Sequence, residues 1–206
     1  MKKIILILLI CLTSESIYSQ INTNDISFEL RYPITTGNNY LNKTLYGGYT
    51  GLIDVGLDFN LVYLKNIGFG ILLNSSTLRF PETNLTLNIL SPKIKIEYSV
   101  SISKIKLIPQ VGIGYSYWTS KAPNYTKTDR GLSFKAGTKL VINNSKRIKW
   151  YFLIVYEYTK LNNSEHKNTD RDNSFNTNIQ LIYPGIGINW TFNKKGEKSP
   201  PPHLAK

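Results

Sequence analysis

The sequence predicts an all-β protein, an eight-stranded antiparallel up-and-down barrel over residues 21–192. Apolar and polar residues alternate in eight segments, and this period of two is the pattern of amphipathic strands. The connections between the segments alternate long, short, long, short. Because antiparallel strands are joined by hairpins, this alternation indicates a barrel whose two ends differ.

A leader precedes the barrel. Residues 1–3 are basic, residues 4–12 are apolar and residues 13–20 are mostly small and polar, which is the layout of a secretory signal peptide. The apolar part is shorter than the roughly 20 residues that span a membrane as a helix. We expect a signal peptide over residues 1–20. Two alternatives stay open: a buried N-terminal strand, and lipidation of Cys11, which the large Ile10 before it disfavours.

The first four strands are expected at about residues 24–34, 49–63, 67–78 and 84–100. A tight turn at Lys65-Asn66 joins the second to the third. In the fourth, the apolar phase changes from Leu87 and Ile89 to Ile94 and Ile96. This change predicts a β-bulge at residues 90–92, where a proline is tolerated.

The last four strands are expected at about residues 105–118, 131–142, 148–159 and 174–192. The final one changes phase near Pro184-Gly185, between Leu181 and Ile186. Short turns are expected at residues 101–104 and 143–147. The longer loops are expected at residues 35–48, 79–84, 119–130 and 160–173.

Side-chain volume decides which face points outward. The apolar set has many large side chains, and the lumen of an eight-stranded barrel is only just wide enough for side chains to fill. The other set combines glycines with acids and bases that can neutralise one another, as buried charges must. This lumen charge network is expected to comprise Glu29, Arg31, Asp54, Asp58, Lys93, Lys95, Glu97, Lys106, Lys135, Lys139, Lys149 and Glu157. The apolar face then contacts lipid, which makes the barrel transmembrane.

Aromatic residues gather near the strand ends in two groups, as expected at the two interfaces of a bilayer. The group beside the long loops is Tyr32, Tyr49, Tyr115, Tyr117, Trp118, Tyr156 and Tyr158. The group at the opposite end is Tyr63, Tyr98, Trp150, Trp190 and Phe192.

Composition limits the function. Cys11 is the only cysteine, so a mature chain without the leader has no disulfide and no cysteine-based metal site. The 25 basic and 13 acidic residues become 23 and 12 once Lys2, Lys3 and Glu15 are removed with the leader. This positive charge suits anionic lipid headgroups or lipopolysaccharide. Since the basic residues are dispersed along the chain, we expect no nucleic-acid partner.

Three segments resemble the small eight-stranded outer-membrane β-barrel proteins of Gram-negative bacteria, the OmpA/OmpX-like, porin-family-like type. They are residues 91–98 (SPKIKIEY), 109–115 (PQVGIGY) and 184–192 (PGIGINWTF). The resemblance covers about residues 21–192 and implies a location in the cell outer membrane. It also implies that Phe192, the closing aromatic, is read by the barrel-assembly machinery. Many such barrels stop at this aromatic, whereas this chain continues with a basic, proline-rich tail. We expect residues 193–206 to be a disordered periplasmic tail.

The sequence indicates no catalytic, cofactor or metal site, since His166 and His203, the only histidines, lie outside the strands. The leading hypothesis is a non-enzymatic protein with a structural or surface-binding role through its extracellular loops. Candidate contacts for a surface glycan, a protein ligand or lipopolysaccharide are Tyr40, Tyr46, Lys121, Tyr125, Lys127, Arg130, His166, Lys167 and Arg171. The alternatives are a narrow gated channel and an accessory subunit of an outer-membrane secretion or assembly complex. A lipid-modifying enzyme is disfavoured by the placement of the histidines.

Overall fold

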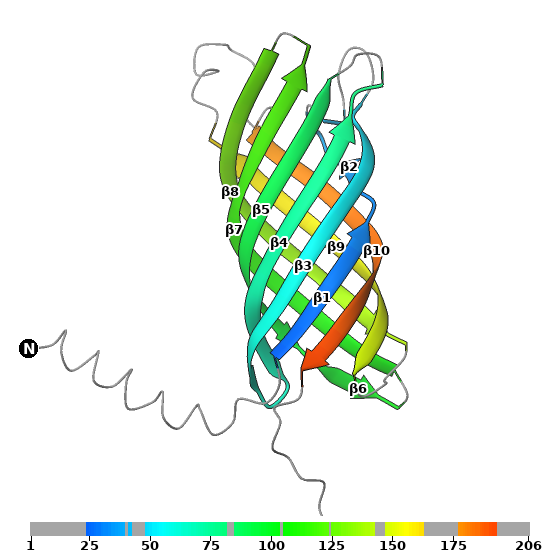
Figure 1. Ribbon diagram of the computed structural model, residues 1–206. Coiled ribbons are helices and arrows are strands. Elements are labelled where there is room, and N and C mark those ends of the chain that lie inside the picture. The colour runs from blue at the N-terminus through cyan, green and yellow to red at the C-terminus, as the bar shows by residue number, and fades with distance from the viewer. Residues whose placement is uncertain are drawn as a thin grey trace, which may run out of the picture.

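The computed structural model describes residues 24–39, 41–42, 48–81, 85–103, 105–123, 125–142, 147–162 and 177–192. Within them, one antiparallel sheet closes on itself through β1 and β10 (Figure 1). Its strands are β1 (Asn24–Arg31), β2 (Ile34–Thr36), β3 (Thr50–Leu64), β4 (Ile67–Arg79), β5 (Thr86–Tyr98), β6 (Val100–Ile102), β7 (Ile105–Ala122), β8 (Tyr125–Val141), β9 (Ile148–Leu161) and β10 (Asn178–Phe192). In this part of the chain, no helix is long and apolar enough to span a membrane.

The ten strands occupy eight positions around the barrel, here called walls, because two of the walls are each divided into two strands. β1 and β2 form one wall and both pair with β10, while β6 continues the β5 wall beyond Ser99 and pairs with β7. Pro33, which lacks an N–H donor, separates β1 from β2. The wall passes close to β3 there, since a Cβ on Gly51 would lie 1.8 Å from the Pro33 carbonyl oxygen. The predicted fold, an eight-stranded antiparallel up-and-down barrel, is confirmed.

The register determines how the strands tilt. Cross-strand partners can be followed once around the barrel through Asp25, Asn60, Gly70, Lys95, Gly112, Lys135, Glu157, Leu181 and Thr35. The path begins at Asp25 and returns to the same wall ten residues further on, at Thr35. A closed barrel with such a stagger must have strands inclined to its axis, as Figure 1 shows.

The β-bulge predicted at residues 90–92 is wrong, and the phase change at Pro184-Gly185 involves no register shift either. β5 keeps a single register through residues 90–92 against β4, and β10 keeps one through Pro184-Gly185 against β9. The apolar residues before each site, among them Ile89 and Leu181, are buried inside the barrel. The hydrophobic pattern therefore changes face because the inward residues change from apolar to charged on β5 and from apolar to glycine and polar residues on β10, while each strand continues in phase. The register shifts lie in β3, at Gly51/Ile53 and at Asn60/Val62.

The barrel has a loop end, where β2, β4, β7 and β9 end, and a turn end, where β3, β6 and β8 end (Figure 1). The tight turn at Lys65-Asn66 is present at the turn end, with a positive φ of 55° at Lys65. The long loop predicted at residues 119–130 is wrong, because β7 and β8 remain paired up to Ala122 and Tyr125. The predicted leader, the tail and most of the last long loop lie outside the described residues.

The outer surface is apolar and the interior is mostly polar. On β5, Ile94 is 66% exposed while its neighbours Lys93 and Lys95 are buried. Most of the aromatics predicted at the interfaces do face outward, but Trp118, Tyr63 and Tyr49 do not. Tyr49 is partly buried and packs against the apolar cluster inside the barrel. Trp118 is buried in the barrel, and the Tyr63 hydroxyl contacts buried side chains because the second β3 register shift turns it inward.

Candidate functional site

Charged side chains fill the interior from the turn end upward. Ten of the twelve residues expected in the lumen are at most 4% exposed, and these ten comprise five acids and five bases. They are Glu29, Arg31, Asp54, Asp58, Lys93, Lys95, Glu97, Lys135, Lys139 and Glu157. Lys106 and Lys149 are partly buried near the turn end. Since side chains two positions apart share one face of a strand, the alternation along each wall brings these groups into one network.

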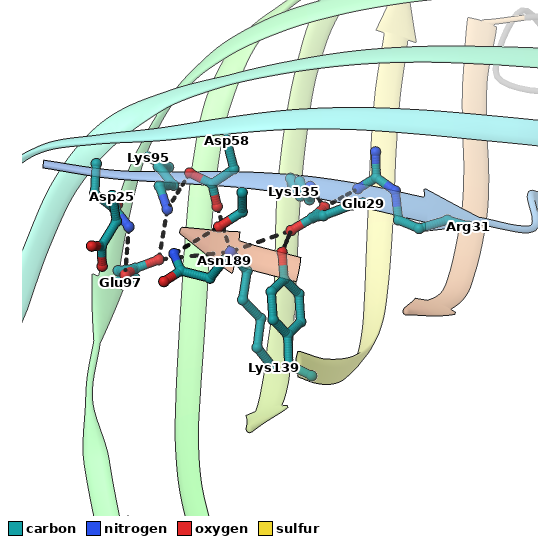
Figure 2. A network of polar contacts seen from close by, with 12 residues as sticks. Asp25, Glu29, Arg31, Asp58, Lys95, Glu97, Lys135, Lys139 and Asn189 are labelled. Carbon is teal, nitrogen blue, oxygen red and sulfur yellow. Dashed lines mark hydrogen bonds and ion pairs between the residues drawn. The ribbon is translucent and has the colours of Figure 1, made fainter. Parts of the chain in front are cut away.

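Lys139 lies at the centre of the network (Figure 2). Its Nζ donates to Asp58 and lies 3.2 Å from Glu29 Oε1. Lys95 joins the same group, with Nζ 2.5 Å from Asp58 Oδ1 and 2.6 Å from Glu97 Oε2. Because each ammonium contacts at least two carboxylates, the loss of either base would leave a buried negative charge uncompensated.

Arg31 and Lys93 form the part of the network nearer the loop end. Arg31 Nη1 lies 3.1 Å from Glu29 Oε2, and its Nε donates to Asp54, which also accepts a hydrogen bond from Ser76. Lys93 Nζ lies 2.9 Å from Glu157 Oε1. These contacts link β1 to β3 and β5 to β9 through the interior of the barrel.

Lys135 is the least well partnered member. Its side chain is buried, and its Nζ lies 4.0 Å from the nearest paired carboxylate oxygen, Glu29 Oε2. Within the described residues this Nζ makes no hydrogen bond. A buried ammonium in this position adds little attraction while it retains its desolvation cost. Lys135 and Lys139, which share the inward face of β8, therefore differ sharply in what they contribute.

An apolar layer fills the loop end of the interior. Its members come from β4, β5, β7, β9, β10 and the segment after β2, and each is at most 3% exposed. They are Leu41, Leu78, Leu87, Ile89, Trp118, Leu161, Ile179 and Leu181. Leu41 is held inside by its neighbour Asn39, whose Oδ1 accepts the Leu41 N–H at 3.0 Å. Sequence reasoning missed this layer because it assigned residues such as Leu87, Trp118 and Leu181 to the outward-facing set.

The structure has a small polar cavity inside the barrel and a larger apolar groove on its outer surface. A cavity of about 20 Å³ at the turn end is lined by polar groups that include Asp25, Tyr63, Lys106 and Asn189, and it is large enough for one water molecule. A groove of about 620 Å³ lies on the outer surface among apolar side chains such as Ile94 and Val111. Because it opens on the outer face of the barrel, it forms no route through the interior.

The structure describes the side chains of three of the nine predicted loop contacts. Lys121 and Arg130 are exposed on β7 and β8, and Lys127 is partly exposed on β8. Tyr40, Tyr46, His166, Lys167, Arg171 and the side chain of Tyr125 lie outside the described residues. Sequence reasoning missed Lys160, which is exposed on β9 close to Arg130. In the described ranges, no group of three or more His, Cys, Asp or Glu residues is placed to hold a metal ion.

A closed barrel with an apolar outer wall and a charged interior is the architecture of a small outer-membrane β-barrel protein. Residues 16–183 match the family model described as outer membrane protein beta-barrel domain. The chain belongs to this family, and its place is the cell outer membrane. No curated protein matches the sequence.

Solved structures show the same fold at low sequence identity. Neisserial surface protein A is 8% identical, with a TM-score of 0.61, over 82% of this chain and 97% of that one. A major outer membrane protein from Thermus thermophilus is 9% identical, with a TM-score of 0.52, over 82% and 99%. Ail, the attachment invasion locus protein of Yersinia pestis, is 12% identical, with a TM-score of 0.50, over 84% and 99%.

Proposed function

We propose that the protein is a non-conducting, non-enzymatic outer-membrane barrel that acts as a rigid support for a binding surface at its loop end. The observation that carries this proposal is the apolar layer across the loop end of the interior. Trp118, Leu87 and Ile179, each at most 1% exposed, lie above a lumen already filled by paired charges. The barrel-assembly machinery would read Phe192, and outer-membrane lipid would surround the walls.

The filled interior argues against the gated-channel alternative. An ion entering from the loop end would meet apolar side chains, and hydrophobic constrictions oppose the passage of ions by excluding water. It would then have to separate ion pairs such as Lys139–Glu29 in a desolvated environment. The interior therefore serves to hold the eight walls together.

The loop end supports a surface role. Binding residues are often placed on connections between rigid elements. The β7–β8 hairpin extends beyond the last β8–β9 pair, Gly131–Leu161, up to the Ala122–Tyr125 pair. It displays Lys121 and Arg130 with threonines and serines, a composition that suits a surface glycan or an acidic protein ligand.

Single-channel recording in planar bilayers tests this proposal. The purified full-length barrel should give no discrete conductance steps across a range of voltages. Trp118→Ala and Tyr117→Ala form a matched pair, because Trp118 points into the lumen and Tyr117, which is 42% exposed, points outward. Steps in the wild-type protein that change in Trp118→Ala but not in Tyr117→Ala would establish a channel and overturn the proposal.

A further inference from the structure

Two basic side chains stand on the outer surface near the loop end. On β8, Ser133 and Lys135 point inward, while Leu132 and Phe134 point outward with 41% and 43% exposure. Arg130 continues the outward series and is exposed. On β9, Lys160 continues the outward series of Phe152, Ile154 and Tyr156 in the same way.

The register places these two residues side by side. Lys160 is the direct cross-strand partner of Leu132, and Arg130 lies two positions further along β8. They are therefore diagonal neighbours on one face, a separation that long side chains can span. The Asn162 backbone N–H donates to the Arg130 carbonyl oxygen at 2.7 Å. The hydrogen bonding between β8 and β9 therefore extends to the level of Arg130 and Lys160.

Neither residue has an acidic partner within the part of the chain that the structure describes. The ion pairs found there lie inside the barrel, between side chains that are at most 4% exposed. Two like charges in this arrangement repel each other. An anion held between them would turn this repulsion into attraction, and a guanidinium can bind a phosphate with two parallel hydrogen bonds.

The level of the pair on the barrel indicates where that anion comes from. Directly toward the turn end lie the outward apolar residues Leu132, Phe134 and Tyr156, and Tyr117 is the cross-strand partner of Arg130 on β7. An outward tyrosine next to an apolar band marks the boundary between hydrocarbon and headgroups. The longer loops of such barrels normally face outside. The pair thus lies at the headgroups of the external leaflet.

We infer that Arg130 and Lys160 bind the phosphate groups of an anionic glycolipid in the external leaflet, with its acyl chains against Leu132 and Phe134. The site faces the membrane and uses neither the interior nor the loops. It is therefore independent of whether the barrel conducts ions, and it shares only Arg130 with the proposed binding surface of the β7–β8 hairpin.

Native mass spectrometry of the full-length barrel, titrated in detergent with bisphosphorylated lipid A, tests the inference. The double variant Arg130→Gln/Lys160→Gln should bind lipid A at least roughly tenfold more weakly than the wild type, since each basic residue contributes to attraction by an anionic headgroup. The charge-preserving variant Arg130→Lys/Lys160→Arg should retain most of the affinity. Dephosphorylated lipid A should bind the wild type as weakly as lipid A binds the double variant.

Arg79→Gln provides the control. Arg79 is also exposed at the loop end, but its cross-strand partners are Thr50 and Thr86, so it is a single basic residue. Its loss should change the affinity by less than the loss of the pair. A heat-modifiable shift in gel electrophoresis checks that every variant is folded. Equal binding by the wild type and the double variant, equal binding of dephosphorylated lipid A, or full competition by inorganic phosphate would overturn the inference.

Discussion

The hydroxyl of Tyr63 lies 2.8 Å from Glu97 Oε1 and 3.2 Å from Asp25 Oδ2, although the alternation of β3 places Tyr63 on the lipid face. The register shift at Asn60/Val62 causes this, because one extra residue moves the following side chains to the other face. The tyrosine thereby joins β1, β3 and β5 at the turn end of the barrel.

Tyr63→Phe should lower the free energy of unfolding by about 1–3 kcal/mol, because it removes a hydrogen bond to a buried carboxylate. Urea titration of the barrel in lipid vesicles measures this. Tyr98→Phe, on the outer surface and 49% exposed, is the matched control and should have almost no effect. Equal effects of the two substitutions would show that the Tyr63 hydroxyl contributes nothing specific.

The two lysines of β8 should behave differently when each is replaced with methionine. Lys139→Met should destabilise the barrel by about 3–5 kcal/mol, since Asp58 and Glu29 lose their shared cation. Lys135→Met should be near neutral or stabilising, because its ammonium lies 4.0 Å from Glu29 and is desolvated. The same vesicle titration compares them, and a larger loss for Lys135→Met would contradict the described pairing.

Much of the fold could be predicted from the sequence, whereas the partners inside the lumen could not. A period of two and a volume argument are local, and they were enough to separate Ile94 from Lys95. The contact between Lys139 and Glu29 joins β8 to β1, so it depends on the ten-residue stagger of the closed barrel. That stagger is a property of all eight walls together.

The misread positions have a second physical cause. An inward apolar residue such as Leu87 is as hydrophobic as an outward one. Only its distance from the loop end determines whether it packs in the interior apolar layer or faces the lipid. The extra residue in β3 near Leu61 lies in a run of apolar and amide side chains with no glycine or proline to mark it. Such a shift is evident only from the pairing with β4.

The outer wall should reject charge. Ile113 and Ile154, 41% and 55% exposed, lie in the apolar bands of β7 and β9. Ile113→Arg or Ile154→Arg should each cost about 2–4 kcal/mol if the position is near the bilayer midplane. Thr128→Arg, at an exposed position of the β7–β8 hairpin, should cost almost nothing. Unchanged folding free energies for both isoleucine variants in vesicles would contradict the prediction that Ile113 and Ile154 face lipid.

The orientation of the barrel is the most decisive prediction. Short turns of such barrels normally face the periplasm and long loops the exterior. In intact cells an impermeant maleimide should therefore label Lys121→Cys and Lys127→Cys, and also Lys43→Cys and Lys167→Cys. It should not label Lys65→Cys at the turn end, nor Lys104→Cys or Lys146→Cys, which the sequence predicts in the short turns. Cys11 is the only cysteine of the sequence, so cleavage of the expected signal peptide would leave no native thiol to compete. The exposed pair Lys65 and Lys121 gives the cleanest comparison, and permeabilised cells provide the control in which every variant should react. Labelling of Lys65→Cys alone in intact cells would show that the barrel has the opposite orientation, with the Arg130–Lys160 pair in the periplasmic leaflet.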